Sequence, residues 1–446
     1  MNRRGSSVPR PDRPTFRPPP WFERDLPAND GATKPRPLRL LVLHWDKFPT
    51  ARMVYREVLP GRDHRVLWIE RGERGEEGFV VAEDGRLESV ESPNPAPVEV
   101  GARPIRGIGN RLRPLCTWAR KWFWTYRRAR GFRPDFVQAR DRVGDALIAW
   151  TVAMLTGSRF AYQIDFLHFE GHLNRTDGER GWKTFRRRLE WRFLVHQRDF
   201  LLRRARPVFA ISEDMRDSFL ERGMRPERVH VFPVGVGRVF ENALLQRQSV
   251  RSGLGVDDEP VVVYLGSLDP SRNTDRIREI LRGLVSRDPT VRLMVLGKGV
   301  SSVSDLMEEW GVADRVVHAG RVPYEDVPRM LAASDVGLFP IDVDVPRRVY
   351  RVSSPLKVAE YMAAAIVTVS SPVPEAAQLL GDSGGGVVVE DNTVESFVEA
   401  TLLYCRDRKS RGSMGRRAHA YVMQFKEFGV LGRVVESVYE QHRPRG

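Results

Sequence analysis

The sequence of 446 residues has little of what marks secreted or membrane-spanning proteins. Its two cysteines, Cys116 and Cys405, lie far apart, so neither a disulfide framework nor a zinc cluster is indicated. The amino-terminal residues lack the apolar core of a signal peptide. The longest apolar stretch, residues 146–155, has about half of the ~20 residues that a membrane-spanning helix needs. These absences predict a protein of the reducing cytoplasm without a transmembrane segment.

Acidic residues are fewer than basic ones. The chain has 72 Lys and Arg against 58 Asp and Glu, a net charge of +14, and a pI near 10.1. This balance predicts a polyanionic partner, which is nucleic acid, an anionic membrane surface or a phosphorylated substrate. The length and a hydrophobic content of 41% predict two domains, each with its own core.

Short apolar runs typical of buried strands alternate with helix-like stretches from Leu38 onward. The expected strands are residues 38–45, 64–70, 134–140, 159–165 and 207–212, then 260–268, 291–299, 315–320, 335–340 and 366–371. Such alternation predicts parallel sheets with right-handed crossovers. The predicted fold class is therefore α/β, with two Rossmann-like, doubly wound domains facing a cleft, and ligands are expected beyond the carboxyl ends of the strands.

The predicted organisation has five parts. Residues 1–37, rich in Pro and Arg, are expected to be disordered. Residues 38–240 and 259–425 are the two Rossmann-like domains, and residues 241–258 are the linker between them. Residues 426–446 are expected to form a helix that packs back toward the N-terminal domain.

The stretch SSPLKVAEYMAAA, residues 353–365, reads as the start of a helix. Ser353 or Ser354 can serve as N-cap, and Pro355 suits the first helical position. The positive end of the helix and Lys357 in its first turn favour an anion such as a phosphate. Glu360 lies on the same face, where its carboxylate can accept hydrogen bonds from a ribose diol. The alternative is a capped surface helix with a Lys/Glu pair.

The second half of the chain resembles the donor-binding domain of family 4 glycosyltransferases, which have two Rossmann-like domains in the GT-B arrangement. The stretches that carry the resemblance are YLGSLDPSRN, VLGKG, HAGRVPYEDVPRMLAASDVGLFP and SSPLKVAEYMAAAIVTVSS. In the first half, residues 209–240 are similar to the segment by which these enzymes leave their acceptor domain. The resemblance implies transfer of a sugar from a nucleotide-diphosphate sugar with retained anomeric configuration and without a metal or other cofactor. It also implies that the N-terminal domain binds the acceptor and the C-terminal domain the donor.

The resemblance also implies a set of donor-binding residues. Glu360 matches the family's second motif glutamate, which holds the nucleotide ribose. Lys357 and the helix start at Ser354 are then expected to face the diphosphate, where positive charge stabilises the leaving group. Arg272 falls where the family has a phosphate-binding Lys, and Gly266 allows the chain to approach the phosphates closely.

Two positions depart from the family pattern. Val352 occupies the position of the first motif glutamate, and Ser267 replaces the usual Arg after the strand-end glycine. We therefore keep Ser267 among the donor-binding residues and expect the sugar contacts to differ from those of the family.

On the acceptor side, Asp165 and His168 follow an expected strand, together with His172. Asp165 and His168 are candidate catalytic residues, because a carboxylate or imidazole facing the cleft can orient the acceptor hydroxyl or accept its proton. The alternative is a polar loop that caps the next helix. His44 is a further candidate. Asp342 and Asp344 have Asp-x-Asp spacing but are read as loop acids, so no metal site is predicted.

Residues 103–133 carry many basic residues and no acidic ones. As a helix, this stretch is amphipathic, with an aromatic face and a basic face. The residues predicted to contact a membrane or the acceptor are Trp118, Arg120, Lys121, Trp122, Arg127 and Arg128. Docking on anionic lipid is the favoured interpretation. The alternative is that the aromatic stripe packs into the domain core beneath a solvated basic face.

The sequence thus predicts a retaining glycosyltransferase that acts on an envelope, lipid-linked or polysaccharide acceptor. Its expected location is the cytoplasm, at the inner membrane face, with no nucleic acid as partner. Two alternatives stay open: a nucleic-acid-binding protein built on Rossmann-type domains, and a glycosyltransferase-like scaffold without activity.

Overall fold

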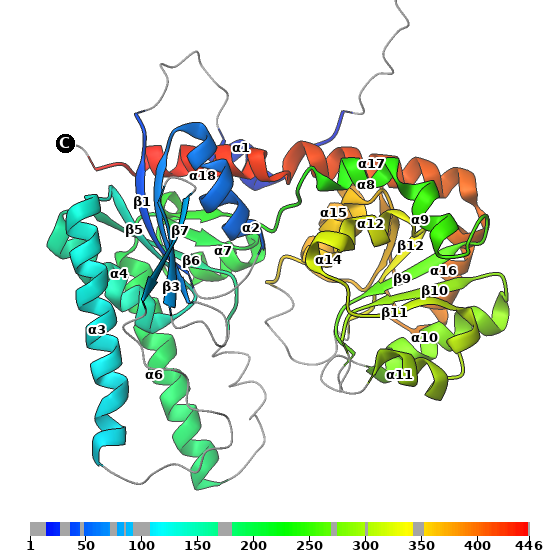
Figure 1. The fold of residues 1–446 in the computed structure, drawn as a ribbon, viewed down its shortest axis with the longest axis horizontal. Helices are drawn as coiled ribbons and strands as arrows, with labels where there is room; N and C mark the ends of the chain where they lie inside the picture. The colour runs from blue at the N-terminus through cyan, green and yellow to red at the C-terminus, as the bar shows by residue number, and fades with distance from the viewer. Residues whose placement is uncertain are drawn as a thin grey trace, which may run out of the picture.

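The structure, a computed structural model, describes residues 15–26, 36–44, 49–71, 78–83, 86–91, 108–167, 181–268, 274–298, 302–341 and 352–444. These residues form two α/β domains, each built around its own sheet (Figure 1). The prediction of two doubly wound, Rossmann-like domains is therefore confirmed.

The first sheet has eight strands in the order β4-β3-β2-β1-β5-β6-β7-β8. They are β1 (Arg39–His44), β2 (Arg65–Arg71), β3 (Gly78–Glu83), β4 (Arg86–Glu91), β5 (Phe136–Arg140), β6 (Arg159–Ile164), β7 (Val208–Ala210) and β8 (Val229–Val231). Six neighbouring strands of this sheet, β2-β1-β5-β6-β7-β8, are parallel to one another. Strands β3 and β4 extend the sheet beyond β2 and are antiparallel to their neighbours. The expectation of a purely parallel sheet was wrong at this edge, because the connection from β2 to β3 is too short for a crossover.

Helical segments cover both faces of the first sheet. They are α2 (Pro49–Met53), η1 (Val54–Val58), η2 (Pro60–Arg62), α3 (Ile108–Phe132), α4 (Val143–Thr156), α6 (Trp182–Arg204), α7 (Glu213–Glu221) and η3 (Pro226–Arg228). Alternate side chains of β1 serve the two faces: Leu41 and Leu43 join the core on the α4 side, and Leu40 and Val42 join the core that contains Tyr55. A strand covered on both faces is apolar at nearly every position, which is why its sequence shows no alternation.

The second sheet has six parallel strands in the order β11-β10-β9-β12-β13-β14. They are β9 (Val261–Leu265), β10 (Arg292–Leu296), β11 (Val316–Gly320), β12 (Val336–Phe339), β13 (Val367–Ser370) and β14 (Gly386–Val388). The surrounding helical segments are α10 (Thr274–Arg287), α11 (Val303–Glu309), η5 (Ala313–Arg315), η6 (Tyr324–Asp326), α12 (Val327–Ala332), α14 (Leu356–Ala363), α15 (Pro374–Ser383), α16 (Val394–Arg406) and α17 (Arg408–Phe425). One core lies under α10 and α16 and another under α14, α15 and α17.

Helices occur in two segments that were predicted to lie outside the Rossmann-like domains. The predicted linker 241–258 contains most of α8 (Val239–Leu245) and all of α9 (Arg247–Gly253), which both pack on α12. Within the N-terminus predicted to be disordered, α1 (Pro20–Asp25) is a helix that buries Trp21. Its order is explained by aromatic anchors in an otherwise Pro- and Arg-rich segment, since apolar burial offsets the entropy of ordering.

The chain returns to the first domain at its carboxyl end. Helix α17 lies along the second domain, and α18 (Phe428–Gln441) lies on the first (red in Figure 1). Gly432 of α18 faces Val58, and the hydroxyl oxygens of Tyr439 and Tyr55 are 3.3 Å apart. In the described part of the chain, no helix is long and apolar enough to cross a bilayer.

Candidate functional site

A pocket of about 520 Å³ lies where the carboxyl ends of β9, β10 and β12 meet the first domain. From the second domain it is lined by Gly266, Lys298, Arg321 and Glu360, among others. From the first domain it is lined by Phe166, which follows β6. The pocket is therefore at the position that doubly wound sheets use for ligands, and both domains contribute to it.

Hydrogen bonds between the domains hold the wall of this pocket. The Ser212 hydroxyl, in the first domain, donates to the carbonyl of Val352 at 2.7 Å. The backbone N–H of Val234 donates to the Ser354 hydroxyl at 3.3 Å. The segment that leads into α14 is thus anchored on the first domain.

Glycines mark the ends of three neighbouring strands at the pocket. The N–H of Gly266, after β9, donates to Leu296 at 2.8 Å, and the N–H of Gly297, after β10, donates to Gly320 at 2.8 Å. Gly266 has φ of +153°, and a side chain there would collide with the ammonium group of Lys357. A side chain at Gly297 would collide with the carbonyl of Gly266. The glycines therefore let the backbone and Lys357 approach each other closely.

Replacing Gly266 by alanine should weaken nucleotide binding by about tenfold or more, since the new methyl group displaces Lys357 and the backbone angle suits glycine only. Isothermal titration with a nucleotide-diphosphate sugar measures this. Gly255→Ala is the matched control, because Gly255 also has a positive φ, +68°, but nothing crowds it. Equal affinity in both variants would contradict a role for the close approach.

Helix α14 begins one residue later than predicted. Pro355 is its N-cap and Leu356 its first residue, and no side chain caps it. The Ser354 hydroxyl instead donates to Oε1 of Glu375 at 2.6 Å, and the same oxygen accepts from the ammonium group of Lys426 at 2.5 Å. The predicted serine cap is wrong, because tertiary partners for the Ser354 hydroxyl replace the helix amides.

Lys357 and Glu360 both line the pocket from the first turns of α14. The Lys357 ammonium lies 5.4 Å from the centre of the Tyr264 ring and against Gly266. Glu360 is buried, which raises its pKa to about 8, although nearby Lys357 works in the opposite direction. A carboxyl group that is protonated at neutral pH can both donate and accept a hydrogen bond.

Tyr361 fixes these two side chains in place. Its hydroxyl accepts from the N–H of Leu265 at 2.8 Å and donates to the carbonyl of Leu338 at 3.2 Å, so α14 is tied to both β9 and β12. Gly337 makes room for the ring, since a side chain there would collide with it. Tyr361 is therefore a positioning residue.

Comparisons with known proteins agree with this architecture. Residues 51–235 match the family model described as "Glycosyl transferase 4-like domain", and residues 246–421 match that described as "Glycosyl transferases group 1". The chain belongs to the GT-B glycosyltransferases. Its sequence is 23% identical over 54% of its length to alpha-D-kanosaminyltransferase of Streptomyces kanamyceticus, covering 61% of that protein.

Two further proteins show the breadth of the likeness. The chain is 27% identical over 38% of its length to a GDP-mannose-dependent alpha-(1-6)-phosphatidylinositol monomannoside mannosyltransferase of Mycolicibacterium smegmatis, covering 44% of it. It spans about half the length of the curated relatives that it matches. Among solved structures, Anabaena HepE in complex with UDP and glucose has a TM-score of 0.58 at 15% identity, with coverage of 90% of this chain and 99% of HepE. At that identity the likeness shows the fold alone.

The pocket of this GT-B chain gathers most of the predicted donor-binding residues, namely Gly266, Ser267, Ser354, Lys357 and Glu360. Arg272 lies outside the described residues. Lys298 and Arg321 were not predicted from the sequence; they follow the ends of β10 and β11 and bring two more positive charges to the pocket. The signal for both was available, because each directly follows a strand-end glycine.

Of the two predicted catalytic residues, His168 lies outside the described residues. His172 and the loop acids Asp342 and Asp344 also lie outside them. Asp165 is buried at the end of β6. Its carboxylate accepts hydrogen bonds from Arg140 at 2.5 Å and from Gln163 at 3.0 Å. The role of Asp165 in catalysis stays a prediction.

Asp165 belongs to a buried polar cluster at the carboxyl ends of β1, β5 and β6. Arg140 also contacts Nε2 of His44 at 3.0 Å. Asp141 accepts from the N–H of Asp165 at 2.8 Å, and its pKa is raised to about 7 by burial and by the charge of Asp165. Arg140 and Asp141 were not predicted from the sequence, because they come close to Asp165 only when β5 and β6 pair.

The predicted membrane or acceptor surface lies on α3. Trp122 donates from its ring to the Thr151 hydroxyl at 2.7 Å, and Lys121 pairs with Asp145 at 2.6 Å, so this side of the helix faces α4. Trp118 is half-buried on the same side and packs against the core. For these tryptophans the structure favours the packing alternative over contact with lipid.

The basic side of α3 remains at the surface. Arg120 and Arg127 are exposed, and the Arg128 guanidinium lies 5.5 Å from the centre of the Trp124 ring. Arg127 and Arg128 also line a hollow of about 540 Å³ together with Arg39 and Arg65.

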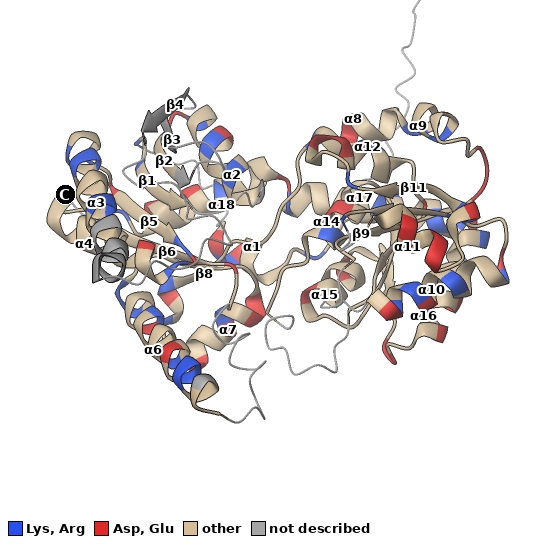
Figure 2. Cartoon of the chain, turned by 60° about the horizontal axis from the view of Figure 1, so that its bottom comes forward, with Lys and Arg blue, Asp and Glu red and all other residues tan. Residues whose placement is uncertain are grey.

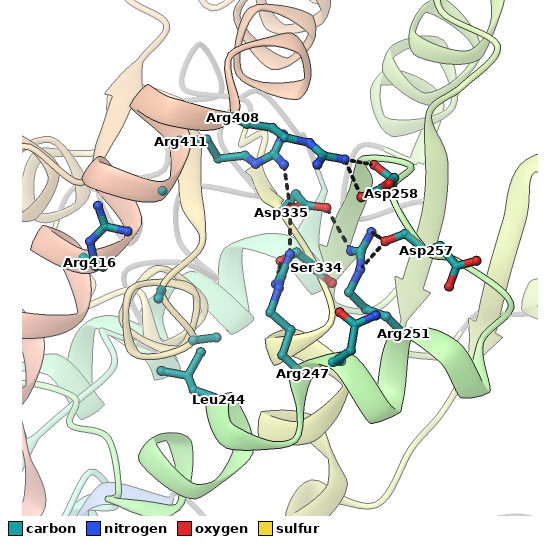
Figure 3. A pocket seen from close by; sticks show the side chains of 14 residues that line it. Leu244, Arg247, Arg251, Asp257, Asp258, Ser334, Asp335, Arg408, Arg411 and Arg416 are labelled. Atoms are coloured by element: carbon teal, nitrogen blue, oxygen red, sulfur yellow. Dashed lines mark hydrogen bonds and ion pairs between the residues drawn. The ribbon is translucent and has the colours of Figure 1, made fainter.

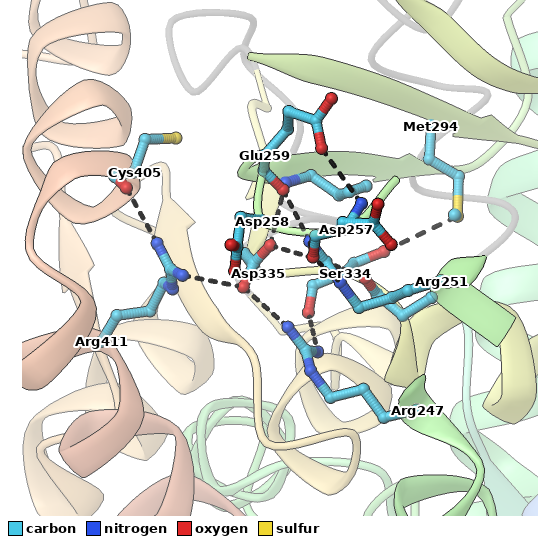
Figure 4. A network of polar contacts seen from close by, with 12 residues as sticks. Arg247, Arg251, Asp257, Asp258, Glu259, Met294, Ser334, Asp335, Cys405 and Arg411 are labelled. Atoms are coloured by element: carbon cyan, nitrogen blue, oxygen red, sulfur yellow. Dashed lines mark hydrogen bonds and ion pairs between the residues drawn. The ribbon is translucent and has the colours of Figure 1, made fainter. Parts of the chain in front are cut away.

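A further hollow of about 400 Å³ lies at the opposite, amino-terminal edge of the second sheet (Figure 3). Three of its arginines converge on Asp335, which precedes β12 (Figure 4). Asp335 pairs with Arg247 at 2.7 Å, Arg251 at 3.1 Å and Arg411 at 3.0 Å. These charges join α9, α17 and the sheet, so the network is structural.

Proposed function

We propose that this protein is a retaining glycosyltransferase that takes a sugar from a nucleotide-diphosphate sugar. The observation that carries the proposal is the placement of Lys357 and Glu360, on one helix start, in a pocket that both domains line. The pocket volume, about 520 Å³, is in the range of small-molecule sites.

Each part of the donor has a matching group in the pocket. Glu360 is suited to the ribose diol, and the start of α14 with Lys357, Lys298 and Arg321 is suited to the diphosphate. As the bond between the sugar and the diphosphate breaks, negative charge develops on the leaving phosphate, and these cations stabilise it. We therefore propose that no metal is needed, and turnover should persist in EDTA.

Retention of configuration has its own support. Among the described residues that line the pocket, Glu360 is the single carboxylate, and we assign it to the ribose. Inversion would need a base opposite the leaving group. In the proposed reaction the acceptor oxygen bonds to the anomeric carbon on the side of the departing diphosphate, and the acceptor proton passes to a phosphate oxygen.

We propose an envelope, lipid-linked or polysaccharide acceptor. The Mycolicibacterium relative is named for action on a phosphatidylinositol mannoside, which is a lipid, and the exposed arginines of α3 suit an anionic surface. Family membership favours the transferase over the nucleic-acid-binding alternative. A protein that binds donor sugars but gives no turnover with any glycan or lipid acceptor would support the inactive-scaffold alternative instead.

Titration with UDP- and GDP-sugars tests the donor site, and Lys357→Ala tests its mechanism. The variant should bind nucleotide diphosphates about tenfold more weakly while its affinity for the free nucleoside is unchanged, since Lys357 is assigned to the phosphates. Lys409→Ala, on the exposed face of α17, is the matched control. An equal loss for nucleoside and nucleotide would remove Lys357 from the diphosphate.

A further inference from the structure

Helix α6 carries an exposed apolar stripe. Trp182, Phe185, Leu189 and Phe193 follow one another at spacings of three and four residues, which places them on one face. Their exposed fractions are 78%, 58%, 60% and 61%. Trp182 and Phe185 also stack on each other, with ring centres 5.7 Å apart. A contiguous exposed stripe of this kind marks an interaction surface, unlike single exposed apolar side chains.

The stripe is distinct from the face by which α6 packs on the domain. Leu201 and Leu202, near the carboxyl end of α6, are buried and lie on other sides of the helix than the stripe, whereas Phe200, which continues the line of the stripe, is half-buried edge-on to Trp150 of α4 at 5.5 Å. Among the described residues of α6 before Arg198, none is buried. The amino-terminal part of α6 therefore projects from the body, and Figure 1 shows it extending below the first sheet.

Positive charge surrounds the stripe. Residues 182–204 contain eight Lys and Arg against two acidic residues, and blue bands follow the helix in Figure 2. Arg186, Arg187 and Arg192 are exposed, and none of them forms an ion pair with another residue in the described part of the chain. Their charges are therefore available to an external anion.

We propose that the amino-terminal part of α6 docks on an anionic lipid bilayer, with the stripe among the acyl chains and the arginines at the phosphate groups. Aromatic side chains flanked by arginines suit the bilayer interface. A second copy of the chain is disfavoured, because it would bring like charges together. Nucleic acid is disfavoured because the stripe includes Leu189, which neither stacks on bases nor binds phosphate. The proposed contact with the membrane is therefore the outer face of α6 and not the tryptophan face of α3, which packs on α4.

The first test is co-sedimentation with vesicles of phosphatidylcholine, with and without phosphatidylglycerol. The wild-type protein should bind the mixed vesicles, bind those without phosphatidylglycerol much more weakly, and dissociate as salt increases. The assay needs neither donor nor acceptor, so its failure would leave the proposed function intact. Absence of binding to the anionic vesicles at low salt would overturn the proposal.

The second test combines Trp182→Gln, Phe185→Gln, Leu189→Gln and Phe193→Gln in one variant. Because all four side chains are exposed, folding and donor affinity should be unchanged, while vesicle partition should fall by about tenfold or more. A double variant of exposed apolar residues in α8 and α16, Leu245→Gln with Leu403→Gln, is the matched control and should bind vesicles like the wild type. Equal loss in both variants would overturn the assignment to α6.

The third test addresses the charges and the rival occupants. Replacing Arg186 and Arg192, which flank the stripe, by glutamine should lower partition on anionic vesicles by about fivefold per charge. Sedimentation equilibrium should give a monomer for the wild type in the absence of vesicles. Self-association, or tight binding of oligonucleotides, that disappears in the four-residue stripe variant would show that the stripe has another occupant and would overturn the lipid assignment.

Discussion

Replacing Glu360 by glutamine should weaken binding of the donor by about 1.5–3 kcal/mol, because the ribose diol loses a carboxylate that accepts its hydrogen bonds. Titration calorimetry with a nucleotide-diphosphate sugar measures this loss. In the wild type, affinity should rise as pH increases toward 8, since binding selects the carboxylate and the empty pocket raises the pKa to about 8. In the variant this pH dependence should disappear.

The same substitution should have the opposite effect on stability. The folded chain holds the Glu360 proton up to about pH 8, whereas the ordinary pKa of the group is 4.5. The folded state therefore binds more protons than the unfolded state between these values, and wild-type stability falls across this range as pH rises. Relative to the wild type, Glu360→Gln should gain on the order of 3 kcal/mol between pH 5 and pH 8.

Thermal unfolding at both pH values measures this difference. Glu308→Gln, at an exposed position of α11, is the matched control and should change neither donor affinity nor the pH dependence of stability. Identical pH profiles for Glu360→Gln and the wild type would show that the buried carboxyl does not hold its proton at neutral pH.

Replacing Asp335 by alanine should destabilise the protein by about 3–5 kcal/mol, because it leaves buried guanidinium groups without their counter-charge. Arg251 is 4% exposed, and Asp335 is the carboxylate that it shares with Arg247 and Arg411 (Figure 4). Oδ2 of Asp335 also accepts from the N–H of Val261 at 2.9 Å, so the start of β9 loses a partner as well. Urea unfolding measures the loss.

Asp258→Ala is the matched control for this prediction. Asp258 pairs with Arg408 at 2.9 Å, but both side chains are exposed, so its removal should cost less than about 1 kcal/mol. Donor affinity of folded Asp335→Ala should be unchanged, because the network lies at the sheet edge opposite the pocket. Similar losses for the two variants would contradict the structural role of Asp335.

The donor pocket was largely predictable because its determinants are local in sequence. Lys357 and Glu360 lie three residues apart, so any helix there places them on one face. Gly266 directly follows an expected strand, and strand ends are where doubly wound sheets bind ligands. Lys298 was not among the predicted residues, and its place in the pocket appeared only when β10 was placed beside β9.

The partners of polar groups were not predictable in the same way. Serine is a residue type that commonly caps helices, yet the Ser354 hydroxyl forms its hydrogen bonds with the Glu375 carboxylate and the N–H of Val234. Both partners come from distant parts of the chain. Asp165 was expected to face the cleft or to cap the next helix, and the pairing of β5 with β6, which brings Arg140 against its carboxylate, was not predicted. Local preference yields to such contacts because an unsatisfied buried polar group costs more than a lost cap.

By itself, the sequence determined the alternation of strands and helices, the two-domain α/β architecture and the helix start that carries Lys357 and Glu360, because hydrophobic period and strand-end position are local properties. Only the tertiary structure decided which apolar helix faces are covered. In α3, the face with Trp122 meets α4, whereas in α6 the stripe from Trp182 to Phe193 meets nothing in the described chain. The reason is that the spacing of apolar residues predicts which face of a helix is apolar, but packing between distant segments decides which neighbour buries that face.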